Sequence, residues 1–205
     1  MAASHNRHCT LMRKLLLFGA LLFLPASSFG QSFEAWVGGG VSNLTNTNIG
    51  AFDPTTGFIT LSNGFRINFR MALNTWRYFG HEIGYAYNRA NWNIGGVEQG
   101  SSIHQGFYDF LAYAVPEGKG RIRPFVAGGV GFSNYVFPGY SATSGGGSTK
   151  FGYNYGAGVK VRVLEIFGVR VDYRQYATPK PFDFPAAPSG WVKQNEFSIG
   201  LGVVL

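Results

Sequence analysis

The residues of this sequence best suited to acid–base or nucleophilic chemistry are two histidines, His81 and His104. An imidazole acts as a general base when a hydroxyl or a water lies within hydrogen-bond reach. His104 follows the pair Ser101-Ser102, but neither histidine has a serine two residues after it. The only cysteine, Cys9, precedes a long apolar run. The sequence shows no metal-ligand spacing and no glycine-rich phosphate loop in a strand–turn–helix setting. We predict no catalytic residue, metal or cofactor.

Charged residues form a second group, and they alternate with apolar residues. In the stretch GVRVDYRQYA (168–177), Arg170, Asp172 and Arg174 share one parity, whereas valines and Tyr173 occupy the other. Successive side chains of a strand point to opposite faces, so this segment has one charged and one apolar face. Opposite charges that share a face can pair. Their chemistry then depends on whether the charged face contacts bulk water or is enclosed.

Composition limits the elements that carry these residues. Of 205 residues only 13% are charged, whereas 17% are aromatic and 30 are glycine. Soluble domains have about 25% charged residues. The scarcity of glutamate and lysine disfavours long surface helices. Beyond residue 30 no stretch of about 18 apolar residues predicts a transmembrane helix.

Residues 1–30 are predicted to be an N-terminal extension and a secretory signal peptide. Two basic residues precede the apolar run LLLFGALLFL, and small residues follow it, which is the three-part pattern of such a signal. Cleavage after Gly30 leaves residues 31–205 as the mature chain. Cleavage after Ser28 and a translation start at Met12 are the alternatives.

The charge of the mature chain argues against a nucleic-acid partner. Removing residues 1–30 takes away Arg7, Arg13 and Lys14, which lowers the basic residues from 17 to 14 against 10 acids, a net charge of +4. The remaining basic residues are dispersed and form no run, unlike a nucleic-acid-binding surface. The exported chain also has no thiol.

Eight segments of about 10 to 14 residues alternate between apolar and polar positions. This period of two is typical of half-buried strands, and about 9 to 11 residues suffice for a tilted strand to cross the hydrocarbon core. The segments are 33–44, 63–74, 79–90, 103–115, 122–136, 150–163, 167–177 and 192–205.

Two features favour a membrane barrel over a soluble β-sandwich or a lipocalin-like barrel, in which the two faces would be reversed. Glycines such as Gly40 and Gly156 share the polar parity, which suits a narrow interior where large side chains alternate with small ones. The connections 45–62, 75–78, 91–102, 116–121, 137–149, 164–166 and 178–191 alternate between long and short, as in outer membrane hairpins. We therefore predict an all-β fold, an eight-stranded antiparallel up-and-down transmembrane β-barrel.

In such a barrel the apolar parity faces lipid and the charged parity faces the lumen. In the fourth segment we place Asp109 inside, which sends Tyr108 and Phe110 to the lipid. Near-balanced charges in a narrow lumen should form a paired, closed plug, because an unpaired buried charge is strongly unfavourable. The predicted lumen charges are Glu34, Arg66, Arg70, Glu82, Asp109, Lys160, Arg162, Arg170, Asp172, Arg174 and Glu196.

The stretch RPFVAGGVGF (123–132) and the last segment resemble the OmpA-like superfamily of eight-stranded outer membrane barrels. The resemblance covers the mature chain and implies no peptidoglycan-binding domain. The C-terminal pattern with Gly200, Val203 and Leu205 resembles the signal for the barrel-assembly machinery, although it ends in leucine where the family usually has an aromatic residue. The resemblance implies a monomer in the outer membrane of a Gram-negative-type bacterium, in contact with lipid and lipopolysaccharide.

Aromatic residues near the segment ends suit the girdles at the two membrane–water interfaces. We assign Trp76, Tyr78, Trp92, Tyr135 and Trp191 to these girdles.

The long connections are the expected place for specific binding. Phe182 and Phe184, between prolines, either anchor a partner or fold back on the barrel rim. The sequence thus favours a structural or surface-interaction role and identifies no ligand. A narrow channel for small solutes or hydrophobic compounds is the alternative, and a lipid A-modifying enzyme is a distant one.

Overall fold

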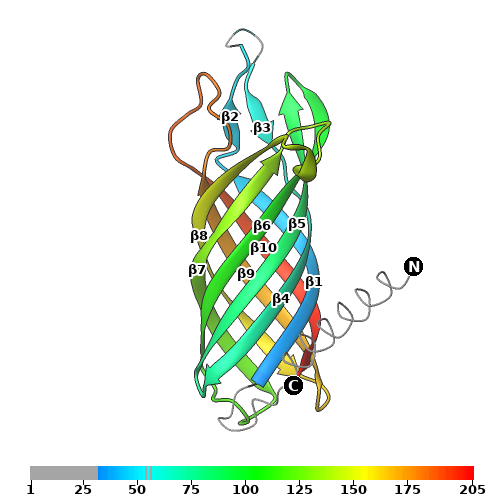
Figure 1. Ribbon diagram of the computed structural model, residues 1–205, viewed down its shortest axis with the longest axis vertical. Coiled ribbons are helices and arrows are strands. Elements are labelled where there is room, and N and C mark those ends of the chain that lie inside the picture. Colours follow the sequence, from blue (N-terminus) through cyan, green and yellow to red (C-terminus); the bar gives the residue numbers. More distant parts are fainter. Residues whose placement is uncertain (1–31, 54, 56) are drawn as a thin grey trace, which may run out of the picture.

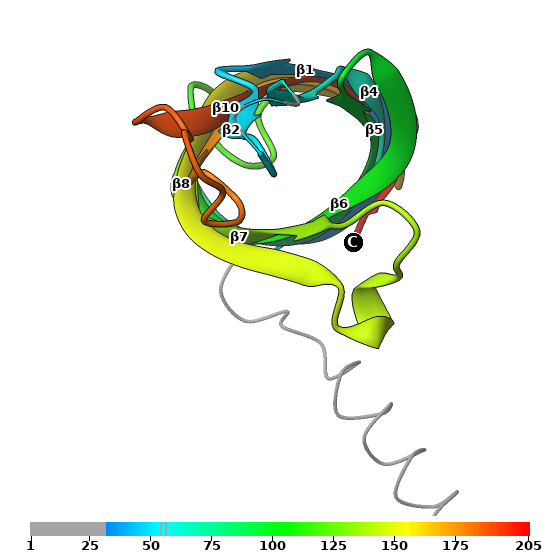
Figure 2. The same cartoon turned by 90° about the horizontal axis from the view of Figure 1, so that it is seen from above.

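Eight long strands form a closed antiparallel barrel in the computed structural model, which describes residues 32–53, 55 and 57–205 (Figure 1). Each pairs with the next long strand along the chain, and the last pairs with the first, so the ring closes (Figure 2). The strands are β1 Ser32–Thr45, β4 Gly64–Trp76, β5 Phe79–Ile94, β6 Val97–Tyr113, β7 Ile122–Val136, β8 Gly147–Arg162, β9 Phe167–Pro179 and β10 Trp191–Val204.

The predicted eight-stranded antiparallel barrel is confirmed. Closure follows from the environment, because backbone amides in hydrocarbon have no water to bind and an open sheet edge would leave a row of them unpaired. None of the helices in the described part of the chain has the length and hydropathy needed to cross a bilayer. The proposed signal peptide at 1–30 lies outside the described residues.

The two faces of the strands have the predicted polarity. In β4, Phe65 and Ile67 are 52% and 54% exposed on the outside, whereas Arg66 and Arg70 are each 1% exposed on the inside. The same holds in β6, where Asp109 is fully buried between exposed Tyr108 and Phe110. Apolar side chains therefore cover the surface that faces lipid, and these arginine and aspartate side chains are enclosed.

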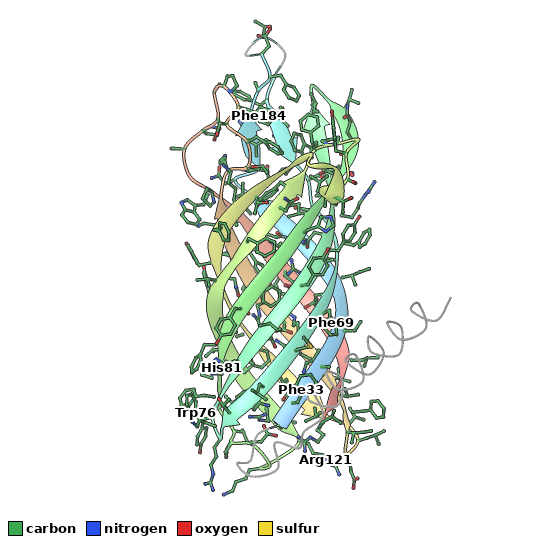
Figure 3. All side chains as sticks on the ribbon, in the orientation of Figure 1. Phe33, Phe69, Trp76, His81, Arg121 and Phe184 are labelled. Carbon is green, nitrogen blue, oxygen red and sulfur yellow. The ribbon has the colours of Figure 1, made fainter. Side chains whose placement is uncertain are left out.

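The connections 77–78, 114–121 and 163–166 join the strands at one end of the barrel. At the other end the connections 46–63, 137–146 and 180–190 are longer, and β5 and β6 form a projecting hairpin (Figure 1). In outer membrane barrels the short turns face the periplasm and the long loops face outward, and we name the two ends accordingly. Figure 3 shows Trp76, His81 and Arg121 toward the periplasmic end and Phe184 at the external end.

The connection predicted at 91–102 is mostly strand. β5 and β6 extend through it and meet at Gly95 and Gly96, whose φ values of 58° and 89° suit a tight turn of glycines. The prediction was wrong because the polarity of the two faces reverses above the membrane: Trp92 and Ile94 share the inward parity of β5 while Asn91 and Asn93 share the outward one, and backbone pairing continues.

The first external loop, between β1 and β4, is also folded. It contains the short strands β2 (Asn48–Gly50) and β3 (Ile59–Leu61), and β3 pairs with β5 from Ile59↔Ile94 to Leu61↔Trp92. A short 3₁₀ turn, η1 (Ala142–Ser144), lies in the loop between β7 and β8. Parts of the first and last external loops lie over the barrel opening (Figure 2).

Candidate functional site

Glu82 of β5 is the centre of the charged side chains in the lumen. Its carboxylate accepts hydrogen bonds from Arg174 Nη2 at 2.8 Å and from Arg170 Nη2 at 3.1 Å, and Arg70 Nη1 lies 3.5 Å away. Glu82 and Arg174 are fully buried. The three arginines come from β4 and β9, so the cluster joins opposite walls of the barrel through side chains.

Glu196 of β10 is a second centre, one layer toward the external end. It pairs with Arg66 Nε at 3.0 Å and with Arg70 Nη2 at 2.8 Å. Asn68 Nδ2 and the Tyr176 hydroxyl donate hydrogen bonds to it at 2.9 and 3.0 Å. Arg70 therefore bridges the two glutamates, and the two centres form one continuous network.

Two aspartates complete this middle region. Asp172 accepts two hydrogen bonds from Arg170, at 2.5 and 2.9 Å. Asp109 pairs with Arg174 and accepts a hydrogen bond from Asn154 Nδ2 at 2.7 Å. Each buried carboxylate thus has a guanidinium partner, the arrangement that makes buried charge tolerable.

A separate group lies at the periplasmic end of the lumen. Lys160 pairs with Glu34, and its ammonium also donates to the Tyr113 hydroxyl at 2.7 Å. Arg123 pairs with Glu117 and lies 3.6 Å from Glu34.

Arg162 differs from the other predicted lumen charges. Its side chain is 36% exposed, and it pairs with Glu117 at 3.3 Å at the barrel rim. The other ten predicted charges are buried inside the barrel. Arg162 is less enclosed because it is the last residue of β8, where the wall ends.

Arg123 and Glu117 were not among the predicted lumen charges. Arg123 shares the inward parity of β7 with Phe125 and Ala127, so the alternation contained the signal. Glu117 lies in a turn, where no parity applies, and only the structure brings it to Arg123 and Arg162. We call the eleven predicted charges together with Arg123 and Glu117 the charge network.

A layer of uncharged polar side chains lies on the external side of this network. Gln105 donates to Ser133 Oγ at 2.8 Å and to Gln194 Oε1 at 2.9 Å. Gln194 in turn donates to Ser42 Oγ and Asn88 Oδ1. These amides connect five strands, β1, β5, β6, β7 and β10, and separate the charges from the apolar residues above them.

Apolar residues close the external end. Trp92 is completely buried, and Ile49, Ile59 and Tyr135 around it are at most 2% exposed. We call this group the external cap: Leu44, Ile49, Ile59, Leu61, Ala90, Trp92, Ile103, Tyr135 and Val192, with Ile94, Phe137, Phe182 and Phe184 packed against it.

The assignment of Trp92 and Tyr135 to the interfacial girdle was wrong. Both side chains lie on the inner face of the sheet. The ring of Trp92 packs edge-on against that of Phe182, with centroids 5.4 Å apart, and the Tyr135 hydroxyl lies 2.7 Å from Thr178 Oγ1. Tyr135 shares the inward parity of Arg123 in β7, so the alternation contained the signal for this residue. Trp92 lies in the segment predicted as a connection, and the folded external loops enclose both side chains. Phe182 and Phe184 fold back on the rim.

The last external loop is held to the first by Lys180. Its ammonium donates to Asn46 Oδ1 at 3.2 Å and to the Asn48 carbonyl oxygen. Partial burial lowers the pKa of Lys180 below its usual range, because desolvation disfavours the charged form. The contact fixes the loop that carries Phe182 and Phe184 beside the β2 strand.

The other predicted girdle residues lie on the outside. Trp76, Tyr78 and Trp191 are 59%, 46% and 41% exposed. Trp191 packs against Tyr153 across the outer surface with ring centroids 5.4 Å apart. Amphipathic rings at the two ends of the apolar band are typical of membrane interfaces.

Both histidines also lie on the outer surface, where tyrosine hydroxyls contact them. Tyr85 Oη is 2.5 Å from His104 Nδ1, and Tyr108 Oη is 2.6 Å from His81 Nδ1. Ser102 Oγ lies 3.3 Å from His104 Nε2, so a hydroxyl neighbour precedes this histidine by two residues. These contacts give each ring a polar partner on a surface that is otherwise apolar.

The predicted assembly residues lie at the closing seam. Gly200 of β10 is paired with Gly38 of β1, and Val203 with Ala35. Leu205 is 65% exposed beyond the end of β10. The seam that closes the barrel therefore joins β1 to the C-terminal strand, β10.

Comparison with known proteins agrees with this architecture. Residues 15–204 match the family described as "Outer membrane protein beta-barrel domain". The chain belongs to this outer membrane β-barrel family. No curated protein matches the sequence significantly.

Solved outer membrane barrels share the fold at low sequence identity. Neisserial surface protein A is 12% identical with a TM-score of 0.56, and the alignment covers 85% of this chain and 96% of that one. Ail, the attachment invasion locus protein of Yersinia pestis, determined with the heparin analogue sucrose octasulfate, is 15% identical with a TM-score of 0.52 and coverages of 85% and 99%. OprG from Pseudomonas aeruginosa is 14% identical with a TM-score of 0.53 and coverages of 85% and 95%. The family match places the barrel, as predicted, in the outer membrane of a Gram-negative-type bacterium.

Proposed function

We propose that this outer membrane barrel is closed to solutes and acts through the external loops that it holds above the membrane. The observation that carries the proposal is the double closure of the lumen. The charge network joins opposite walls through buried ion pairs around Glu82 and Glu196, and the external cap covers it with apolar side chains. A solute would have to break both.

The external loops have the properties of a binding platform. The first and last loops are anchored through Lys180 and through Phe184, whose ring lies 5.1 Å from that of Phe52. Phe52, Phe58 and Tyr140 remain 48%, 56% and 62% exposed at the external end. A rigid scaffold that presents exposed loop side chains is the usual basis of loop-mediated recognition.

Insertion into the membrane is proposed to involve the barrel-assembly machinery, with Gly200, Val203 and Leu205 in the recognised strand. Lipid and lipopolysaccharide surround the apolar band, and the barrel acts as a monomer. The proposal assigns no catalytic residue.

Single-channel conductance in planar bilayers tests the closed lumen. We expect the wild-type barrel to insert and to pass little or no steady current. Arg170→Ala and Arg174→Ala should each leak, because each leaves partner carboxylates without a guanidinium and opens space in the network. Arg89→Ala, which removes an exposed cation outside the lumen, should pass as little current as the wild type. A steady wild-type current would make the barrel a channel and would overturn the proposal.

A further inference from the structure

The periplasmic end of the lumen contains a small cavity surrounded by positive charge. The cavity, which we call the inner mouth, is lined by Glu34, Trp36, Arg121, Arg123, Lys160 and Arg162, together with uncharged residues of the adjoining turn and strands. Figure 3 shows Arg121 at this end of the barrel. Four of the lining residues are cations, and one is a carboxylate.

The carboxylates near the inner mouth do not balance these cations. Glu34 pairs with Lys160 and lies near Arg123, while Glu117 pairs with Arg123 and Arg162. Two carboxylates therefore face four cations.

Arg121 takes part in no ion pair within 4.0 Å in the described part of the chain. The same is true of Glu165, an exposed turn residue that borders an adjacent surface hollow with Arg121 and Arg162. Even if Glu165 is counted, the inner mouth carries excess positive charge.

The charge network as a whole shows the same imbalance. Its cations Arg66, Arg70, Arg123, Lys160, Arg162, Arg170 and Arg174 are seven, and its anions Glu34, Glu82, Asp109, Glu117, Asp172 and Glu196 are six. A buried charge without a counter-charge is strongly unfavourable.

Arg123 pairs with Glu117 but has a further donor without an acceptor. The side chain of Arg123 is 7% exposed, and its Nη2 has no hydrogen-bond partner among the described residues. Its Nε reaches the Val115 carbonyl oxygen at 3.4 Å, and the guanidinium stacks on the Tyr113 ring at 3.8 Å. Nη2 is therefore a buried, charged donor without an acceptor, and it belongs to a residue that lines the cavity.

We infer that the inner mouth binds a small monovalent anion such as chloride, held by Arg123 Nη2 and neighbouring cations. The cavity volume of about 20 Å³ accommodates one species of about the size of a water molecule. This size favours a single-atom anion over sulfate or phosphate. The bound anion neutralises the excess charge and stabilises the closed end of the lumen.

Thermal unfolding of the protein purified in detergent tests this site. The apparent Tm is measured while sodium methanesulfonate is replaced by sodium chloride at constant ionic strength. We expect the wild-type Tm to rise with chloride and to saturate, because a ligand that binds only the folded state stabilises it. Arg123→Gln should lose this shift, and Arg121→Gln should reduce it.

Arg77→Gln is the matched control, because Arg77 is an exposed cation on a periplasmic turn that does not line the cavity. It should keep the full chloride-dependent shift. Equal shifts in wild type, Arg121→Gln and Arg77→Gln would overturn the proposal even if Arg123→Gln failed to fold. So would the absence of any shift in the wild type.

Crystals grown in bromide provide a direct measurement. In wild-type crystals we expect an anomalous difference peak within hydrogen-bond distance of Arg123 Nη2. Crystals of the double variant Arg121→Gln/Arg123→Gln should show no such peak. An inner mouth without anomalous density in the wild type would contradict it.

Discussion

The single carboxylate of Glu82 is the counter-charge of three arginines in the lumen. Three guanidinium groups from two strands converge on its carboxylate, and none of these side chains is exposed by more than 1%. Removing one partner of a buried ion pair is more harmful than replacing the whole pair, because the remaining charges lose their counter-charge without regaining water.

We therefore expect Glu82→Gln to lower the free energy of unfolding by about 3–5 kcal/mol, the range for a broken buried pair. The measurement is reversible urea unfolding of the barrel in lipid vesicles. Glu165→Gln is the control, because Glu165 is an exposed residue on the turn 163–166 and forms no ion pair in the described chain. A loss for Glu82→Gln no larger than that of the control would show that the network does not stabilise the fold.

Most of the charge network was accessible to sequence reasoning, because the parity of each strand fixes which side chains are enclosed. Arg123 obeys the same parity. The pairing of Glu82 with Arg170 and Arg174 was not accessible, because it depends on the width of the closed barrel and on side chains that reach across it.

Within a strand, the two faces impose opposite demands on side-chain size. β1 contains three successive glycines, of which Gly40 faces inward and Gly39 outward. A Cβ at Gly40 would lie 2.0 Å from the Phe197 carbonyl oxygen, whereas a Cβ at Gly39 would have its nearest neighbour, the Arg66 carbonyl oxygen, at 3.6 Å. Only the inward position requires the absence of a side chain.

We predict that Gly40→Ala destabilises the barrel by about 1–3 kcal/mol through overpacking. Gly39→Ala is the matched control in the same strand and should change stability by no more than about 0.5 kcal/mol. The folded fraction after refolding, read from the heat-dependent shift in gel mobility, and the urea midpoint measure both. If the two variants behave alike, the close approach of β1 and β10 does not limit side-chain size at Gly40.

At the scale of the whole molecule, the protein has two enclosed regions of different character. The charge network fills the membrane-spanning part, and the external cap lies above it around Trp92. The cap is made by loops and strand extensions, so its stability is separable from that of the barrel, which is closed by backbone pairing.

Trp92→Ala should therefore unfold the external loops and leave the barrel closed. Removal of a fully buried tryptophan costs about 3–5 kcal/mol of folding free energy. Limited proteolysis of intact outer membranes should show new cleavage in 51–58 and 180–190, with an unchanged urea midpoint for the barrel. Trp191→Ala, at the outer surface, should not expose these loops. Loops that stay protected in Trp92→Ala would mean that the cap does not depend on this residue.

The sequence by itself determined the barrel, its strand number and the side of each strand that is enclosed. These follow from a period of two and from the requirement that every backbone amide in a membrane be paired. Only the tertiary structure decided that Trp92 and Tyr135 belong to an enclosed cap, that 91–102 continues the β5–β6 hairpin and that Glu117 reaches Arg123. Loops and turns have no fixed parity, so the positions of their side chains depend on contacts between segments far apart in the chain.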